Sequence, residues 1–191
     1  TYLMGETCYY YPCAMFCREA YKDGKFGNFS YGASQYYHNI DAISYGKRPE
    51  ERGMPPLLYP THSTAMVLST MPGVYAKKVI ALGYKESPRT DIYGTEGQNI
   101  YNNPFSNTVM LLELSNGGIA RISENRCVGW RAPETYISQF YGTDGGYEFS
   151  VAKHHLAHWN EDDVKNQEKI TRVVMKDVSE KLQPKSVYEM V

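Results

Sequence analysis

Two tight-turn dipeptides in the second half of the chain constrain its fold most strongly. Asn116-Gly117 and Asp144-Gly145 each stand between two segments of strand-like composition. Such dipeptides favour two-residue hairpins, so we expect the strands on either side of each turn to be antiparallel neighbours. The strand-like segments are 31–38, 77–84, 107–114, 119–124, 135–141, 147–151 and 169–178.

Helical patterns are confined to the first part of the chain. Two helices are expected. The later one should begin at Pro60 and Thr61, because apolar residues follow there at helical spacing. Early helices and late strands predict an α+β fold, with an open, mainly antiparallel β-sheet and the helices on one face. The first helix is expected to end at Gly24 and to present one apolar face. That face consists of Cys13, Phe16, Cys17 and Ala20.

His62 falls in the first turn of the second expected helix. The unpaired N–H groups and the positive dipole end of a helix disfavour an imidazolium ion. We therefore expect His62 to be neutral near pH 7 and able to exchange a proton with a substrate hydroxyl. Tyr59, three residues earlier, brings a phenol to the same turn. The alternative is that His62 only caps the helix or packs against it.

Composition limits the classes of protein and partner. A chain of 191 residues with 42% hydrophobic content is consistent with a single domain spanning 1–191. Lys and Arg number 20 against 21 Asp and Glu, so no basic field attracts nucleic acid or an anionic membrane. No apolar run approaches the length of a membrane span. The compartment stays open: the cytoplasm is favoured, and export is not excluded.

The cysteine and histidine patterns do not predict a metal site. The spacing of the four cysteines does not match common zinc patterns, and we expect Cys13 and Cys17 to be buried thiols. His154, His155 and His158 include a pair at i and i+4 but have no intervening Glu or partner Cys, so we assign no metal ligands. We expect that stretch at the surface or between subunits. The 18 tyrosines suit either carbohydrate contacts or a sheet face that packs on a second subunit.

The order of short motifs along the chain resembles the C-terminal domain of the Gfo/Idh/MocA oxidoreductases. The resemblance covers most of the chain up to about Ser150. Glu6, Tyr59 and His62 look most similar to the branch that contains the NAD-dependent α-N-acetylgalactosaminidases. The motifs are Glu6-Thr7-Cys8-Tyr9, Phe26-Gly27, Tyr36-Tyr37-His38, Tyr59-Pro60-Thr61-His62, Asn116-Gly117-Gly118 and Gly142-Thr143-Asp144-Gly145.

The resemblance implies a substrate-binding and oligomerisation domain of an NAD(P)-dependent enzyme that acts on a sugar or polyol. It also implies an N-terminal Rossmann domain with a glycine-rich turn and a Glu-Lys-Pro segment, and neither motif occurs in this sequence. We therefore expect this chain to be a C-terminal fragment that binds no NAD(P) and is inactive by itself. Its partners would be the missing Rossmann domain and a second copy bound through the open sheet face.

The site residues expected from the residues and the resemblance together fall into two groups. His62 and Tyr59 are the expected catalytic residues. The expected substrate contacts are Glu6, Tyr36, His38 and Arg48, the last in a polar loop at 40–54 that is long enough to act as a lid.

Two function hypotheses remain. In the first, His62 takes or gives the proton of a reacting hydroxyl in a sugar or polyol dehydrogenase, or in a glycosidase that uses the same redox step. In the second, the domain is a non-catalytic sugar-binding and oligomerisation module.

Overall fold

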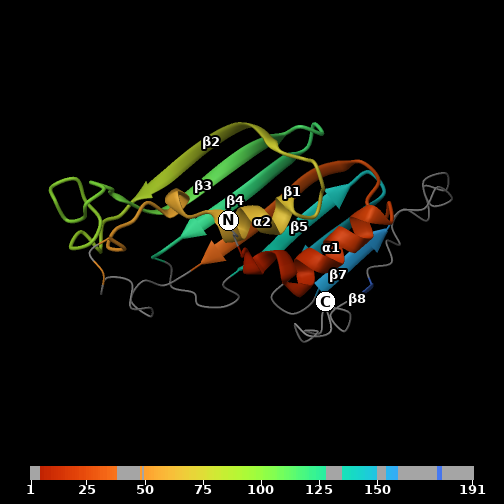
Figure 1. Cartoon of the computed structure of the whole chain (residues 1–191), viewed down its shortest axis with the longest axis horizontal. Helices are drawn as coiled ribbons and strands as arrows, with labels where there is room; N and C mark the ends of the chain where they lie inside the picture. Colours follow the sequence, from red (N-terminus) through yellow and green to blue (C-terminus); the bar gives the residue numbers. More distant parts are fainter. Residues whose placement is uncertain are drawn as a thin grey trace.

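The described strands form one open sheet in the order β2-β3-β4-β1-β5-β6-β7-β8 (Figure 1). The computed structural model describes residues 5–37, 48, 50–127 and 135–149, together with the backbone of 154–158 and 176–177. The pairings are antiparallel except for that between β1 and β4. The expected α+β fold with an open, mainly antiparallel sheet is therefore confirmed.

Short helical segments precede and follow the first strand. The 3-10 helices are η1 (Thr7–Tyr10) and η2 (Pro56–Leu58), and the α-helices are α1 (Pro12–Lys22) and α2 (Thr61–Leu68). The strands are β1 (Phe29–Tyr37), β2 (Ala76–Lys85), β3 (Phe105–Leu114), β4 (Ile119–Asn125), β5 (Thr135–Gly142), β6 (Gly145–Phe149), β7 (His154–His158) and β8 (Lys176–Asp177).

Both α-helices cover the same face of the sheet (Figure 1). Phe140 of β5 lies at the centre of the core between helix and sheet, with ring centroids 4.8 Å from Phe26 and 4.8 Å from Phe29. Tyr21 of α1 packs edge-on against the same ring. Cys13 and Cys17 are buried free thiols in this core, as expected.

The opposite face of β2 and β3 is apolar and exposed. In β3 the buried side chains alternate with exposed ones, because successive residues of a strand point to opposite faces. Val109 and Leu111 therefore face away from the helices, and each pairs with an exposed residue of β2, Leu82 and Ile80 respectively. At β3 the sheet thus has one covered face and one open apolar face, whereas the edge strand β2 is exposed along nearly its whole length.

Most of the helices and strands expected from the sequence are present, but several begin or end at other residues. The second helix ends at Leu68, and the buried Met71 follows it outside the helix. The expected strand 147–151 is observed as Gly145–Phe149, and that at 169–178 is described as a strand at Lys176–Asp177. His154–His158 form a strand that the sequence did not predict, and it pairs with β6.

Several expectations fall outside the described residues. His38 and most of the polar loop at 40–54 belong to this group. None of the helices in the described part of the chain is long and apolar enough to cross a membrane.

Candidate active site

The start of α2 fixes the position of His62. Pro60 caps the helix, and His62 is its second residue, directly before the buried Ser63. The hydroxyl of Ser34 in β1 donates to the carbonyl oxygen of Ser63, which ties this turn to the sheet. His62 therefore lies at the border between the core and the surface, with 19% of its side chain exposed.

Glu6 contacts His62 from a segment 56 residues earlier. Its Oε1 lies 2.7 Å from Nδ1 of His62 and also accepts a hydrogen bond of 2.9 Å from the backbone N–H of Cys8. Burial by itself would raise the pKa of the Glu6 carboxyl, but the hydrogen bonds from His62 and Cys8 outweigh it and lower that pKa. Glu6 is therefore ionised at neutral pH and acts only as an acceptor.

Tyr59 contacts the other nitrogen of the imidazole. Its Oη lies 3.1 Å from Nε2 of His62. Because a neutral imidazole has one donor and one acceptor nitrogen, we assign Nδ1–H as the donor to Glu6 and Nε2 as the acceptor from Tyr59. We call these three side chains the Glu6–His62–Tyr59 cluster.

Of the other expected substrate contacts, Tyr36 lies beside the cluster, whereas the described contact of Arg48 is with Glu51. The rings of Tyr36 and His62 are 5.0 Å apart, and Tyr36 is largely buried. Arg48 is exposed and forms an ion pair of 3.2 Å with Glu51. His38 is outside the described residues, so its role remains a prediction together with that of Arg48.

Glu6, Cys8 and His62 are close enough to consider as metal ligands, with ligand atoms within 4.8 Å of one another. A metal would require the Cys8 thiolate. Burial, together with the Glu6 carboxylate, raises the pKa of the Cys8 thiol to about 12. Glu6 is hydrogen-bonded to both His62 and the backbone N–H of Cys8, and we assign no metal to this group.

Sequence reasoning missed a buried ion pair near the cluster. Glu124 and Arg126, at the end of β4, lie 3.1 Å apart through Oε2 and Nη2, and both side chains are almost fully buried. The other carboxylate oxygen of Glu124 accepts a hydrogen bond from the hydroxyl of Ser63. The available signal was a pair of opposite charges two residues apart at the end of a strand, which is also common at surfaces.

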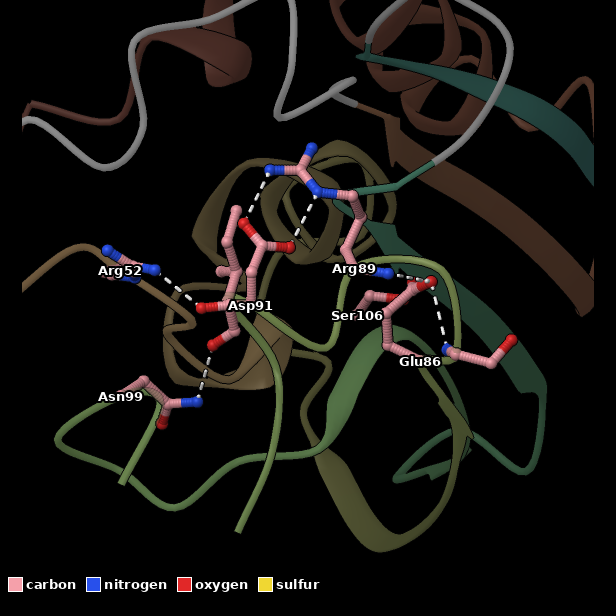
Figure 2. A network of polar contacts seen from close by, with 8 residues as sticks. Arg52, Glu86, Arg89, Asp91, Asn99 and Ser106 are labelled. Atoms are coloured by element: carbon pink, nitrogen blue, oxygen red, sulfur yellow. Dashed lines mark hydrogen bonds and ion pairs between the residues drawn. The ribbon is translucent and has the colours of Figure 1, made fainter. Parts of the chain in front are cut away.

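A second polar network ties the loop between β2 and β3 to the segment before η2 (Figure 2). The guanidinium of Arg89 pairs with the carboxylate of Asp91 at 3.2 Å, and Arg52 donates to the carbonyl oxygen of Asp91 at 2.6 Å. At the base of the loop, Ser106 donates to the buried carboxylate of Glu86. Polar contacts therefore hold this loop where a large apolar core is lacking.

Replacing Asn99 by alanine should destabilise this loop. The Asn99 amide donates to the carbonyl oxygens of Ile92 at 2.9 Å and Asn103 at 3.0 Å, and its oxygen accepts from the N–H of Tyr101. The variant leaves these buried groups unpaired, so we expect the free energy of unfolding to fall by about 2 kcal/mol. Denaturant unfolding of the 191-residue chain measures this. Asn28→Ala, at an exposed position, is the control, and equal stability of the two variants would contradict the prediction.

No protein-family model and no curated protein matches the chain. Solved structures do match. An oxidoreductase domain protein from Kribbella flavida matches with a TM-score of 0.62 and 16% identity, over 91% of this chain and 45% of that one. Levoglucosan dehydrogenase in complex with NADH and L-sorbose matches with a TM-score of 0.63 and 15% identity, over 90% and 44%.

An inositol dehydrogenase homolog from Azotobacter vinelandii, complexed with NADH and myo-inositol, matches with a TM-score of 0.58 and 13% identity, over 81% of this chain and 38% of that one. Two of these neighbours are thus described as dehydrogenases or their homologs in complex with NADH, and the third as an oxidoreductase domain protein. The chain shares the fold of part of them. It spans less than half of their length, and the identities are too low to transfer a substrate.

Proposed function

We propose that this chain is the substrate-binding part of an NAD(P)-dependent oxidoreductase that acts on a sugar or polyol, with His62 as the group that accepts the hydroxyl proton. The observation that carries the proposal is the Glu6–His62–Tyr59 cluster, in which Glu6 fixes the tautomer that leaves Nε2 as a proton acceptor. The dehydrogenase neighbours crystallised with a sugar or polyol support the substrate class.

The described residues include a group that can accept the proton released in such a reaction. When an alcohol is oxidised, its carbon loses a hydride to a nicotinamide cofactor and its oxygen loses a proton. Nε2 of His62 takes that proton, directly or through the hydroxyl of Tyr59, and the Glu6 carboxylate stabilises the imidazolium that forms.

The described sheet does not fit a dinucleotide by itself. Dinucleotide-binding folds are mostly parallel sheets with a glycine-rich strand-to-helix turn, whereas only one pair of described strands, β1 and β4, is parallel. We therefore propose that this chain is not the cofactor-binding part of the enzyme. Calorimetry on the 191-residue chain should show no saturable NAD(P) binding, and micromolar binding would contradict this assignment.

The activity test uses the complete product of the gene that encodes this chain. We expect it to reduce NAD⁺ or NADP⁺ when one member of a panel of sugars and polyols is added, as measured by the absorbance of the reduced nicotinamide. Sugar binding by calorimetry without any such reduction across the panel would instead support a non-catalytic module.

A redox-type glycosidase is the second candidate, because Glu6 and the segment from Tyr59 to His62 also suit that chemistry. Oxidation of a sugar carbon acidifies the neighbouring C–H, so the glycosidic group can be eliminated and the carbonyl reduced again after water adds. The distinguishing result is release of nitrophenol from a nitrophenyl glycoside with no net change in reduced nicotinamide.

We also propose that the open face of the sheet binds a second copy of this chain. Leu82 is 78% exposed, and Ile80, Val109 and Leu111 extend the apolar surface around it. A surface of this kind on a single sheet face is typical of symmetric interfaces.

Replacing Leu82 by glutamate should weaken the self-association by an order of magnitude or more. A charge buried at the centre of an apolar interface is left without a partner, which costs about 2 kcal/mol or more. Sedimentation equilibrium measures the dissociation constant. Ile100→Glu, a similarly exposed residue in the loop between β2 and β3, is the control. A chain that is monomeric at high concentration before any substitution would contradict the proposal.

A further inference from the structure

Glu124 and Arg126 form a buried ion pair that contacts the start of α2 through Ser63. Glu124 is fully buried and Arg126 is 2% exposed. Glu124 uses one carboxylate oxygen to accept from the hydroxyl of Ser63 and the other to pair with Arg126 at 3.1 Å. Ser63 directly follows His62 in the chain. The hydrogen bond from Ser63 to Glu124 therefore holds the residue next to the imidazole.

Arg126 is linked to the imidazole through the ring of Tyr36. Its guanidinium carbon lies 4.9 Å from the ring centroid of Tyr36, within the range of a cation–π contact. The ring of Tyr36 in turn lies 5.0 Å from the ring of His62. The ion pair is therefore linked to His62 through the backbone at Ser63 and through the aromatic ring of Tyr36.

A buried ion pair is by itself a weak source of stability. Two charges lose their hydration when they are buried, and apolar residues of similar size often give equal or greater stability. The pairing is also incomplete: Nη1 of Arg126 has no partner among the described residues, and the contact between Nη2 and Oε2 of Glu124 lacks good hydrogen-bond geometry. This ion pair, whose pairing is incomplete among the described residues, contacts Ser63 and Tyr36, which both adjoin His62.

We propose that Glu124 and Arg126 are positioning residues that hold the imidazole of His62 in its working orientation, Glu124 through Ser63 and Arg126 through Tyr36. This proposal rests on the proposed function, in which His62 accepts the proton. It adds that the orientation of His62 depends on the position of the end of β4. The residues around His62 in the sequence do not show this dependence.

The test compares two serine variants that lose the same kind of bond. Ser63→Ala removes the hydroxyl that donates to Glu124, and Ser106→Ala removes the hydroxyl that donates to the buried carboxylate of Glu86 (Figure 2). None of the described contacts of the Ser106 side chain reaches His62. Both variants should lower the midpoint of thermal unfolding by comparable amounts, because each leaves one buried carboxylate without its donor.

The two variants should differ in turnover of the complete gene product. We expect Ser63→Ala to lower kcat by about tenfold with little change in KM, since small misplacements of a catalytic group cost up to about a hundredfold. Ser106→Ala should leave kcat within about twofold of the parent, the range of an indirect effect. Ser63→Thr keeps the hydroxyl and should recover most of kcat.

A second readout does not depend on activity. In the 191-residue chain, the ring resonances of His62, assigned with His62→Gln, should shift in Ser63→Ala and Glu124→Gln and stay unchanged in Ser106→Ala. Unchanged His62 resonances in Ser63→Ala, or an unchanged kcat with a lowered melting temperature, would overturn the positioning role. If His62→Ala itself keeps full turnover, the proposed function fails instead, so the two failures are distinguishable.

Discussion

Replacing His62 by alanine should lower the turnover of the complete gene product by roughly a hundredfold or more, because a positioned general acid or base contributes on that scale. The imidazole is the only member of the Glu6–His62–Tyr59 cluster that contacts both of the others, through Nδ1 and Nε2. Its removal therefore abolishes the proton acceptor and leaves Glu6 and Tyr59 unconnected.

Variants of the two flanking residues test the assigned roles within the cluster. Tyr59→Phe removes one hydroxyl and keeps the ring, and Glu6→Gln keeps an acceptor for His62 but removes the negative charge. We expect each to lower kcat by less than His62→Ala does. The effects should not be additive when the variants are combined, since the three groups act as a unit.

Cys13→Ala is the control for indirect effects of stability. Cys13 is buried in the helix-to-sheet core, with Sγ 3.8 Å from Sδ of Met66, and it takes no part in the cluster. It should lower stability with little change in turnover per folded molecule. Normal turnover in a folded His62→Ala variant would show that His62 only caps or packs.

Replacing Phe140 by alanine should lower the free energy of unfolding by about 3–5 kcal/mol, the usual cost of truncating a fully buried aromatic side chain. Phe140 is fully buried, and its ring meets Phe26, Phe29 and Tyr21, so three elements lose contacts at once. Denaturant unfolding of the 191-residue chain gives the difference.

Phe105→Ala is the matched control at an exposed position. Phe105 is 39% exposed at the start of β3. We expect its truncation to cost about 1 kcal/mol or less, since exposed substitutions seldom cost more. Similar losses for the two phenylalanines would mean that the core does not lie between the helices and β5.

The features that the sequence predicted correctly depend on local signals. Asn116-Gly117 forms the expected tight turn, in which Gly117 has a φ of 87° and the side chain of Asn116 accepts from the N–H of Gly118. Pro60 marks the start of α2, so the place of His62 in its first turn was predictable as well. Neither inference needed knowledge of the rest of the fold.

The features that the sequence did not predict depend on contacts between distant segments. Hydrophobic patterns do not encode which strand lies beside β1, so the parallel pairing with β4 was not expected. The placement of Glu6 beside His62 followed only from the resemblance, because 56 residues separate them. Glu124 was missed because glutamate is almost never fully buried unless it is paired, and its partners are assembled only in the fold.

A crystal structure of the complete gene product with reduced cofactor and a sugar or polyol that it turns over tests the central claim most directly. We expect the reacting hydroxyl within hydrogen-bond reach, about 2.6–3.2 Å, of Nε2 of His62, either directly or through the hydroxyl of Tyr59. A reacting hydroxyl that contacts no member of the Glu6–His62–Tyr59 cluster would contradict the proposal that His62 accepts its proton.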